Sequence, residues 1–152
     1  MYIEFRFLGY TQALEVYHRL TMDHDNPKKI QRAGDIQRIK SHFPEYKDWL
    51  NKIFANSFSM SFQERVTELF EKYYEIVSLY FKYNKKNSFL DTVKSARNYY
   101  THYSKKLKKK VPYNDDFFWL TKDVELLLRL CILSELNEAF YVKKLANKGR
   151  NS

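Results

Sequence analysis

Between Val124 and Leu133 every residue is apolar except Glu125 and Arg129, and this run limits the folds open to the chain. Wound into a helix, the segment is apolar around most of its circumference, and its two charges, four residues apart, form an exposed pair. The run is far shorter than the roughly 20 apolar residues of a membrane span, so we expect no membrane partner. It predicts instead a central helix over about residues 115–145 that other helices surround.

The surrounding helices are predicted from apolar residues that recur at intervals of three and four. The pattern predicts helices over residues 2–21, from Pro44 to the polar cluster at 56–61, over 61–80 and over 88–107. Ser61 and Glu64 form a capping box, and Pro112 prevents the last of these helices from continuing. Residues 28–42 are polar with few apolar positions, so they are either a short helix or a mobile connection.

Together these segments predict an all-α fold, an antiparallel bundle of about five helices. The sequence shows no strand pattern and no internal repeat, and its 152 residues are the length of one domain. We expect a single helical domain over residues 1–147 and a frayed tail over residues 148–152. The first helix begins at Met1 without a capping residue, which suggests a fragment of a longer protein.

Glycine, cysteine and histidine are placed in ways that argue against several classes of site. The three glycines are isolated from one another, which argues against a glycine-rich phosphate loop. Cys131 is the only cysteine, which fits a reducing, cytoplasmic compartment, and its apolar neighbours indicate an inert packing residue. The four histidines are scattered without metal-ligand spacing, so we expect no metal and no cofactor.

The positive charge is concentrated in one segment. Residues 82–110 carry ten lysine and arginine side chains against one carboxylate, Asp91, and they account for the whole formal net charge of +9. A neutral body with one cationic segment is typical of proteins that bind nucleic-acid phosphates, because lysine and arginine release condensed counterions there. The run from Lys105 to Lys110, taken alone, fits a solvated tail equally well.

One face of the predicted helix over residues 88–107 carries polar side chains. At about 100° per residue they form a stripe opposite the apolar one, made of Asp91, Ser95, Asn98 and His102. Asn98 and His102 lie one turn apart, and Arg97 reaches the same region through the length of its side chain. A twofold axis would gather two copies of each group into one site, so we expect a homodimer.

These residue types suit cleavage of RNA without a metal. The imidazole of His102 can move a proton to or from a ribose 2′-hydroxyl or a leaving 5′-oxygen. The guanidinium of Arg97 can hold the scissile phosphate, and Asn98 can orient the histidine or the phosphate. The residues predicted to hold the RNA, by charge or by stacking, are Lys94, Tyr99, Lys105, Lys106, Lys108, Lys109 and Lys110.

The segment Arg97-Asn98-Tyr99-Tyr100-Thr101-His102 resembles the signature of the HEPN superfamily, an arginine, commonly with a polar residue after it, and a histidine a few residues on. Residues 13–19 and 62–66 are similar to the ApeA-like HEPN group. The resemblance implies an all-helical domain that dimerises with its motif helices facing each other and cleaves RNA without a metal. It also implies the C-terminal effector of a larger anti-phage (abortive infection) protein, with a sensor in its N-terminal part.

Other interpretations remain open. Arg19 and His24 repeat the same spacing, but they flank a predicted helix end, and we interpret His18 and His24 as ordinary residues. A non-catalytic HEPN-like module for dimerisation or RNA binding would keep Arg97 and His102 as a simple pair. A basic DNA-binding bundle has less support, because no short recognition helix follows a tight glycine turn.

Overall fold

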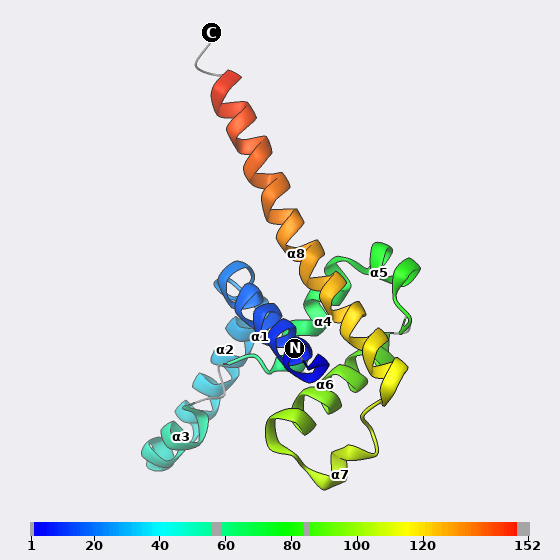
Figure 1. The fold of residues 1–152 in the computed structure, drawn as a ribbon. Coiled ribbons are helices and arrows are strands. Elements are labelled where there is room, and N and C mark those ends of the chain that lie inside the picture. Colours follow the sequence, from blue (N-terminus) through cyan, green and yellow to red (C-terminus); the bar gives the residue numbers. More distant parts are fainter. Residues whose placement is uncertain (1, 56–58, 84–85, 149–152) are drawn as a thin grey trace.

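The computed structural model describes residues 2–55, 59–83 and 86–148, with side chains up to Asn137. These residues form eight α-helices and one 3₁₀ turn and contain no strand, which confirms the all-α class but exceeds the predicted count of about five. Figure 1 shows a body crossed by one long helix, α8, that runs past the others toward the C-terminus. The helices of the body are α1 (Ile3–Thr21), α4 (Phe62–Lys72), α6 (Lys86–His102) and α8 (Asn114–Lys148). Residues 149–152 of the expected tail lie outside the described residues.

The hydrophobic core lies where these four helices meet. Phe7 and Leu14 of α1 are fully buried, as are Val124 and Leu127 of α8, so the start of the apolar run packs in the core as predicted. Its end does not, because Ile132 and Leu133 are about half exposed where α8 leaves the body. Burial raises the pKa of the Cys131 thiol to about 12, which keeps it protonated and unreactive. None of the described helices is both long enough and apolar enough to cross a bilayer.

The charged pair on α8 differs from the prediction. Glu125 and Arg129 do pair, at 2.6 Å, but Glu125 is buried and not exposed. Its carboxylate also binds Lys122 at 2.9 Å and lies 3.5 Å from Arg6 of α1, which covers it. Hydrogen bonds from Lys122 and Arg129 outweigh the effect of burial and lower the pKa of Glu125.

Residues 28–42 belong to a helix, α2 (Pro27–His42). Asn26 caps it by accepting from the backbone N–H of Lys28 at 3.0 Å, and Pro27 occupies the first turn, where no donor is needed. The 3₁₀ turn η1 (Pro44–Tyr46) and α3 (Lys47–Phe54) pack against α2, and Figure 1 shows this arm projecting from the body. Because the arm has few neighbours, its large apolar side chains Trp49 and Ile53 are exposed.

The predicted helix over residues 61–80 is two helices. The capping box of Ser61 and Glu64 is present and starts α4, but α4 ends at Lys72 and α5 (Tyr74–Tyr80) follows as a separate helix. The change of direction brings Phe81 into the core against Phe70. It leaves Tyr80, the last residue of α5, 72% exposed.

The predicted helix over residues 88–107 ends earlier, at His102. Tyr103 adopts the left-handed conformation with φ of 49°, and its backbone N–H donates to the carbonyl of Tyr99 at 2.6 Å. The chain then forms the short α7 (Lys105–Lys108), which packs back against α6. As a result Tyr103 is 74% exposed, and His102 is the last residue of its helix, whereas the predicted bounds placed it inside the helix.

Candidate active site on helix α6

Arg97 is held between three neighbours from three helices. Its Nη2 lies 3.7 Å from Oε2 of Glu15 on α1, and its guanidinium carbon lies 5.1 Å from the centre of the Phe62 ring on α4. Its Nη1 donates to Oδ1 of Asn98 on α6 at 3.3 Å. The Arg97 side chain is 29% exposed, so this anchored guanidinium still reaches solvent, where an anion can approach its remaining donors.

The contact with Arg97 fixes how Asn98 is oriented. Arginine has only donors, so the Asn98 oxygen must face it and the Asn98 amide nitrogen points elsewhere. That nitrogen has no hydrogen-bond partner among the described residues. Asn98 therefore offers two free N–H donors beside the guanidinium, which suits an oxygen-rich ligand.

Two cavities meet at Lys94 and Asn98. The smaller, about 220 Å³, contains Arg97 and is bounded by the start of α4 at Ser61, Phe62 and Gln63. The larger, about 570 Å³, runs between α6 and the α7 segment and is lined by Asp91, Thr92, Lys94, Ser95, Asn98, Leu107 and Lys110. Both are open to solvent. A single extended ligand can therefore cross from one cavity to the other.

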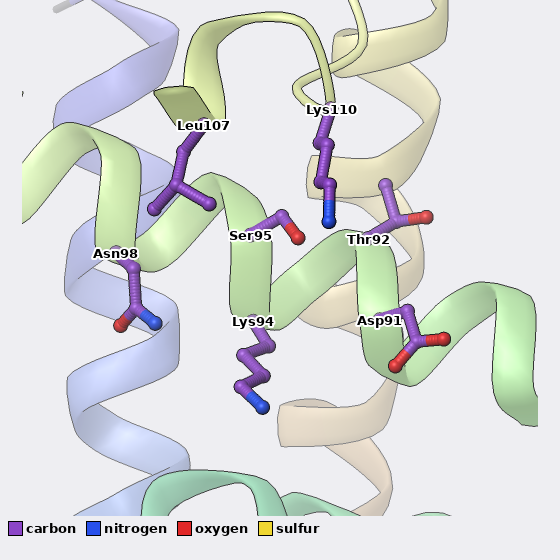
Figure 2. Close-up of a pocket in the computed structure, with 7 residues that line it drawn as sticks. All are labelled: Asp91, Thr92, Lys94, Ser95, Asn98, Leu107 and Lys110. Carbon is purple, nitrogen blue, oxygen red and sulfur yellow. The ribbon is translucent and has the colours of Figure 1, made fainter. Parts of the chain in front are cut away.

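Figure 2 shows how the larger cavity, the α6–α7 groove, is built. Leu107 and Lys110 reach toward α6 from the α7 segment, with Ser95 beneath them, and Lys94 and Asp91 extend from the opposite side of α6. Lys94 is itself braced, because its Nζ donates to the Gln63 side chain on α4 at 2.7 Å. The groove thus presents ammonium groups along both rims.

His102 stands apart from these cavities within one chain. It is exposed at the end of α6, one turn beyond Asn98 on the same face, and no described side chain hydrogen-bonds to it. The structure records no contact between His102 and Arg97. One chain brings Arg97, Asn98 and Lys94 together but leaves the imidazole of His102 facing solvent.

The predicted RNA-binding residues fall into two places. Five lysines follow the end of α6, all exposed and without a hydrogen bond or ion pair from their side chains in the described part of the chain: Lys105, Lys106, Lys108, Lys109 and Lys110. By contrast, Lys82 and Lys86 pair with Asp116 and Glu71. Tyr99 does not lie with the lysines, because its ring packs against Tyr100 at 5.0 Å in a separate aromatic cavity beside α1.

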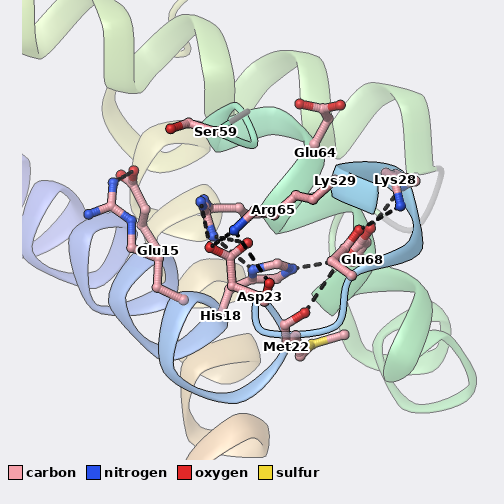
Figure 3. A network of polar contacts seen from close by, with 12 residues as sticks. Glu15, His18, Met22, Asp23, Lys28, Lys29, Ser59, Glu64, Arg65 and Glu68 are labelled. Carbon is pink, nitrogen blue, oxygen red and sulfur yellow. Dashed lines mark hydrogen bonds and ion pairs between the residues drawn. The ribbon is translucent and has the colours of Figure 1, made fainter. Parts of the chain in front are cut away.

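Sequence reasoning missed a buried polar network behind this site, shown in Figure 3. His18, fully buried on α1, contacts Glu68 through Nε2 at 2.8 Å and Arg65 through Nδ1 at 3.1 Å, both on α4. Because arginine can only donate, Nδ1 accepts and Nε2–H donates to the Glu68 carboxylate. His18 is therefore held in the core by hydrogen bonds at both ring nitrogens.

The network continues to the start of α2. Asp23 lies 3.2 Å from Arg65 and 3.1 Å from Lys29, and Glu68 accepts from Asn26 at 2.9 Å and binds Lys28 at 2.9 Å. Burial acts to raise the pKa of Asp23 and Glu68, but hydrogen bonds from the neighbouring cations and amides outweigh it and lower both. Both carboxylates consequently stay charged at neutral pH.

This network lies close to the two residues of other helices that contact Arg97, Glu15 and Phe62. On α1, Glu15 lies one helical turn before His18 of the network. On α4, Phe62 lies one turn before Arg65, so the network joins the two helices beside both residues that contact Arg97. Helical spacing is the feature of the sequence that points to these two residues. His18 follows the buried Leu14 by four residues, and Arg65 precedes the buried Leu69 by four. Spacing places such residues on a core face but does not show which of them meet.

The fold and the site together define a class of protein: an all-α domain in which an arginine and an asparagine of one helix border a cation-lined groove. The family model for Apea-like HEPN domains matches residues 8–138, most of the chain. The chain belongs to the Apea-like HEPN family. Comparison with curated proteins and with solved structures finds no match.

Proposed function

We propose that this chain is a metal-independent endoribonuclease whose working site forms at the interface of a homodimer. The observation that carries the proposal is the restraint on Arg97, which Glu15, Phe62 and Asn98 hold beside two joined cavities. A guanidinium, an ammonium and an amide donor placed together match the charge and the oxygen geometry of a phosphodiester. Membership of a HEPN family supports the same function.

The proposed reaction is displacement at phosphorus. The ribose 2′-oxygen forms a bond to phosphorus as the bond to the 5′-oxygen breaks, giving a 2′,3′-cyclic phosphate and a 5′-hydroxyl. One imidazole accepts the proton of the 2′-hydroxyl and another donates a proton to the leaving oxygen. Arg97 and Asn98 stabilise the charge that grows on the phosphate oxygens.

A second chain is part of the proposal because one chain supplies one His102, away from the anchored Arg97. Pairing along α6 would bring a second imidazole toward the groove and supply the second proton carrier. A monomer lacks that carrier. Light scattering is therefore expected to give a mass of twice the 18.5 kDa of one chain under conditions where RNA is cleaved.

The test compares the wild type with His102→Ala on single-stranded RNA in the presence of EDTA. Loss of a general acid–base group is expected to lower the cleavage rate by about 100-fold or more. Because His102 is exposed and contacts no described side chain, far-UV circular dichroism should show unchanged helicity. His42→Ala is the matched control, since His42 is exposed on α2 and, among the described residues, hydrogen-bonds only to the Arg38 carbonyl of its own helix.

Equal cleavage by the wild type and His102→Ala, cleavage by neither, or a requirement for magnesium would contradict the proposal. A chain that binds RNA and dimerises without cutting would be the non-catalytic module. The anti-phage role rests on family membership alone. It predicts that His102→Ala abolishes protection of cells against phage.

A further inference from the structure

The cationic segment over residues 82–110 contains one carboxylate, Asp91. Asp91 lines the α6–α7 groove together with Lys94 and Lys110. Its carboxylate forms no hydrogen bond or ion pair with any described residue, although two ammonium groups line the same groove. A groove that bound phosphates alone would be weakened by this charge, because like charges repel. The matching ligand has to offer hydrogen-bond donors as well as an anionic group.

A nucleotide meets both requirements. Its phosphate suits the ammonium groups of Lys94 and Lys110, and its sugar or base can pack on the apolar surface of Leu107. Ser95 and Asn98 supply further polar contacts. The groove volume of about 570 Å³ lies within the roughly 300–1,000 Å³ that small-ligand sites occupy.

The bases differ in what they offer to a carboxylate, which can only accept. Guanine presents two adjacent donors, N1–H and the N2 amino group, that match the two oxygens of Asp91. Adenine and cytosine present one amino group beside an acceptor, and uracil presents one N–H between two carbonyl oxygens. The acceptor atoms of these three bases would be repelled by the negative charge of Asp91, which would weaken their binding.

We propose that the α6–α7 groove is a nucleobase subsite that selects guanine through Asp91. The inference rests on the proposed function in that the ligand is RNA. Because Lys94 and Asn98 line both cavities, a guanosine in the groove places an adjoining phosphate at the cavity that holds Arg97. The subsite thus positions cleavage next to a guanosine.

The experiment measures binding, separately from cleavage. His102→Ala protein is titrated by fluorescence anisotropy with labelled uridine hexamers that carry one guanosine, inosine, adenosine or cytidine at the same internal position. The guanosine hexamer is expected to bind about ten-fold more tightly than those with adenosine or cytidine. Inosine, which keeps N1–H but lacks the N2 amino group, should fall between them.

In the same His102→Ala protein, Asp91→Asn should bring the ratio of affinities for the guanosine and adenosine hexamers close to one. The reason is that an amide offers one acceptor oxygen in place of two. Asp91 is exposed and pairs with no residue that the structure describes, so the variant should fold normally. Asp48→Asn, on α3 in the projecting arm, is the matched control and should keep the preference.

Equal binding of all hexamers, or a guanosine preference that survives Asp91→Asn, would overturn the subsite and leave the proposed ribonuclease standing. A guanosine preference lost in Asp91→Asn, in a protein whose wild type cleaves no RNA, would support the subsite and reject the nuclease. Failure to bind any hexamer would reject both.

Discussion

Arg65 keeps a full positive charge in the interior because its neighbours compensate it. It is 2% exposed and meets the carboxylate of Asp23 and the unprotonated nitrogen of His18. Such a group is hard to replace singly, since its partners would be left buried without a donor.

Arg65→Met is therefore expected to lower the free energy of unfolding by about 3–5 kcal/mol, as measured by urea denaturation. Arg38→Met is the control, because Arg38 pairs with Asp35 at the surface of α2, and it should change stability by less than about 1 kcal/mol. If the two variants lost similar stability, the buried network would not be what joins α1 to α4.

At the scale of single residues, the sequence points to candidate site residues but not to their contacts. It singled out Arg97, Asn98 and His102, but not that Glu15 and Phe62, from two other helices, hold Arg97. The partners of Arg65 lie more than 40 residues away along the chain. The periodicity of apolar residues describes one helix at a time, so it does not predict which residues of different helices are in contact.

The end of α6 is the element that most affects the candidate site. Tyr103 stops the helix by adopting a positive φ, which places His102 at its tip and turns α7 back over the groove. The apolar spacing continued to Leu107 and predicted a longer helix, because a tyrosine carries no recognisable stop signal, unlike glycine.

Substitution at Tyr103 tests this geometry. Glycine adopts the left-handed conformation freely and an isoleucine resists it, so Tyr103→Ile should unfold about 1–2 kcal/mol more easily than Tyr103→Gly in urea. Equal stability of the two variants would mean that the helix does not end there in solution.

The lysines of α7 and of the residues directly after it have a proposed role in RNA binding that can be measured. Lys108→Glu with Lys109→Glu should weaken RNA binding and reduce the slope of log affinity against log salt, by about one for each phosphate that the variant no longer neutralises. Lys47→Glu with Lys52→Glu, on α3, is the control. An unchanged salt slope would make the α7 lysines a passive solvated run.

Across the whole molecule, acid should loosen the contacts that join α2 to the body. The pKa values of Asp23, Glu64 and Glu68 lie below their ordinary values of 3.8, 4.5 and 4.5. The unfolded chain therefore takes up protons at these carboxylates before the folded one does. Their stabilisation is complete above the ordinary values and is lost as pH falls toward the lowered ones.

Urea unfolding midpoints should accordingly fall between about pH 5 and pH 3, and Glu68→Gln should make that decline shallower. Asp123, whose pKa burial raises, contributes in the opposite direction. A decline equally steep in Glu68→Gln and the wild type would assign acid sensitivity to other groups.

The architecture as a whole was largely predictable. The apolar run at 124–133, the capping box at Ser61 and the helix over residues 2–21 determined the class and most of the body. The sequence could not decide whether residues 28–42 are helical, because α2 buries one apolar residue, Ile36, and so leaves little periodic signal.

The concentration of positive charge around α6 and α7 affects how two chains would meet. Apposed motif helices press like-charged surfaces together, and Coulomb repulsion opposes that pairing in dilute salt. An RNA strand bound between the two helices would remove this repulsion, because its phosphates neutralise the positive charges of both chains. The RNA would then hold the two chains together. In the proposed dimer, assembly and RNA binding would then favour each other by the same factor, and the two chains would separate where RNA is scarce.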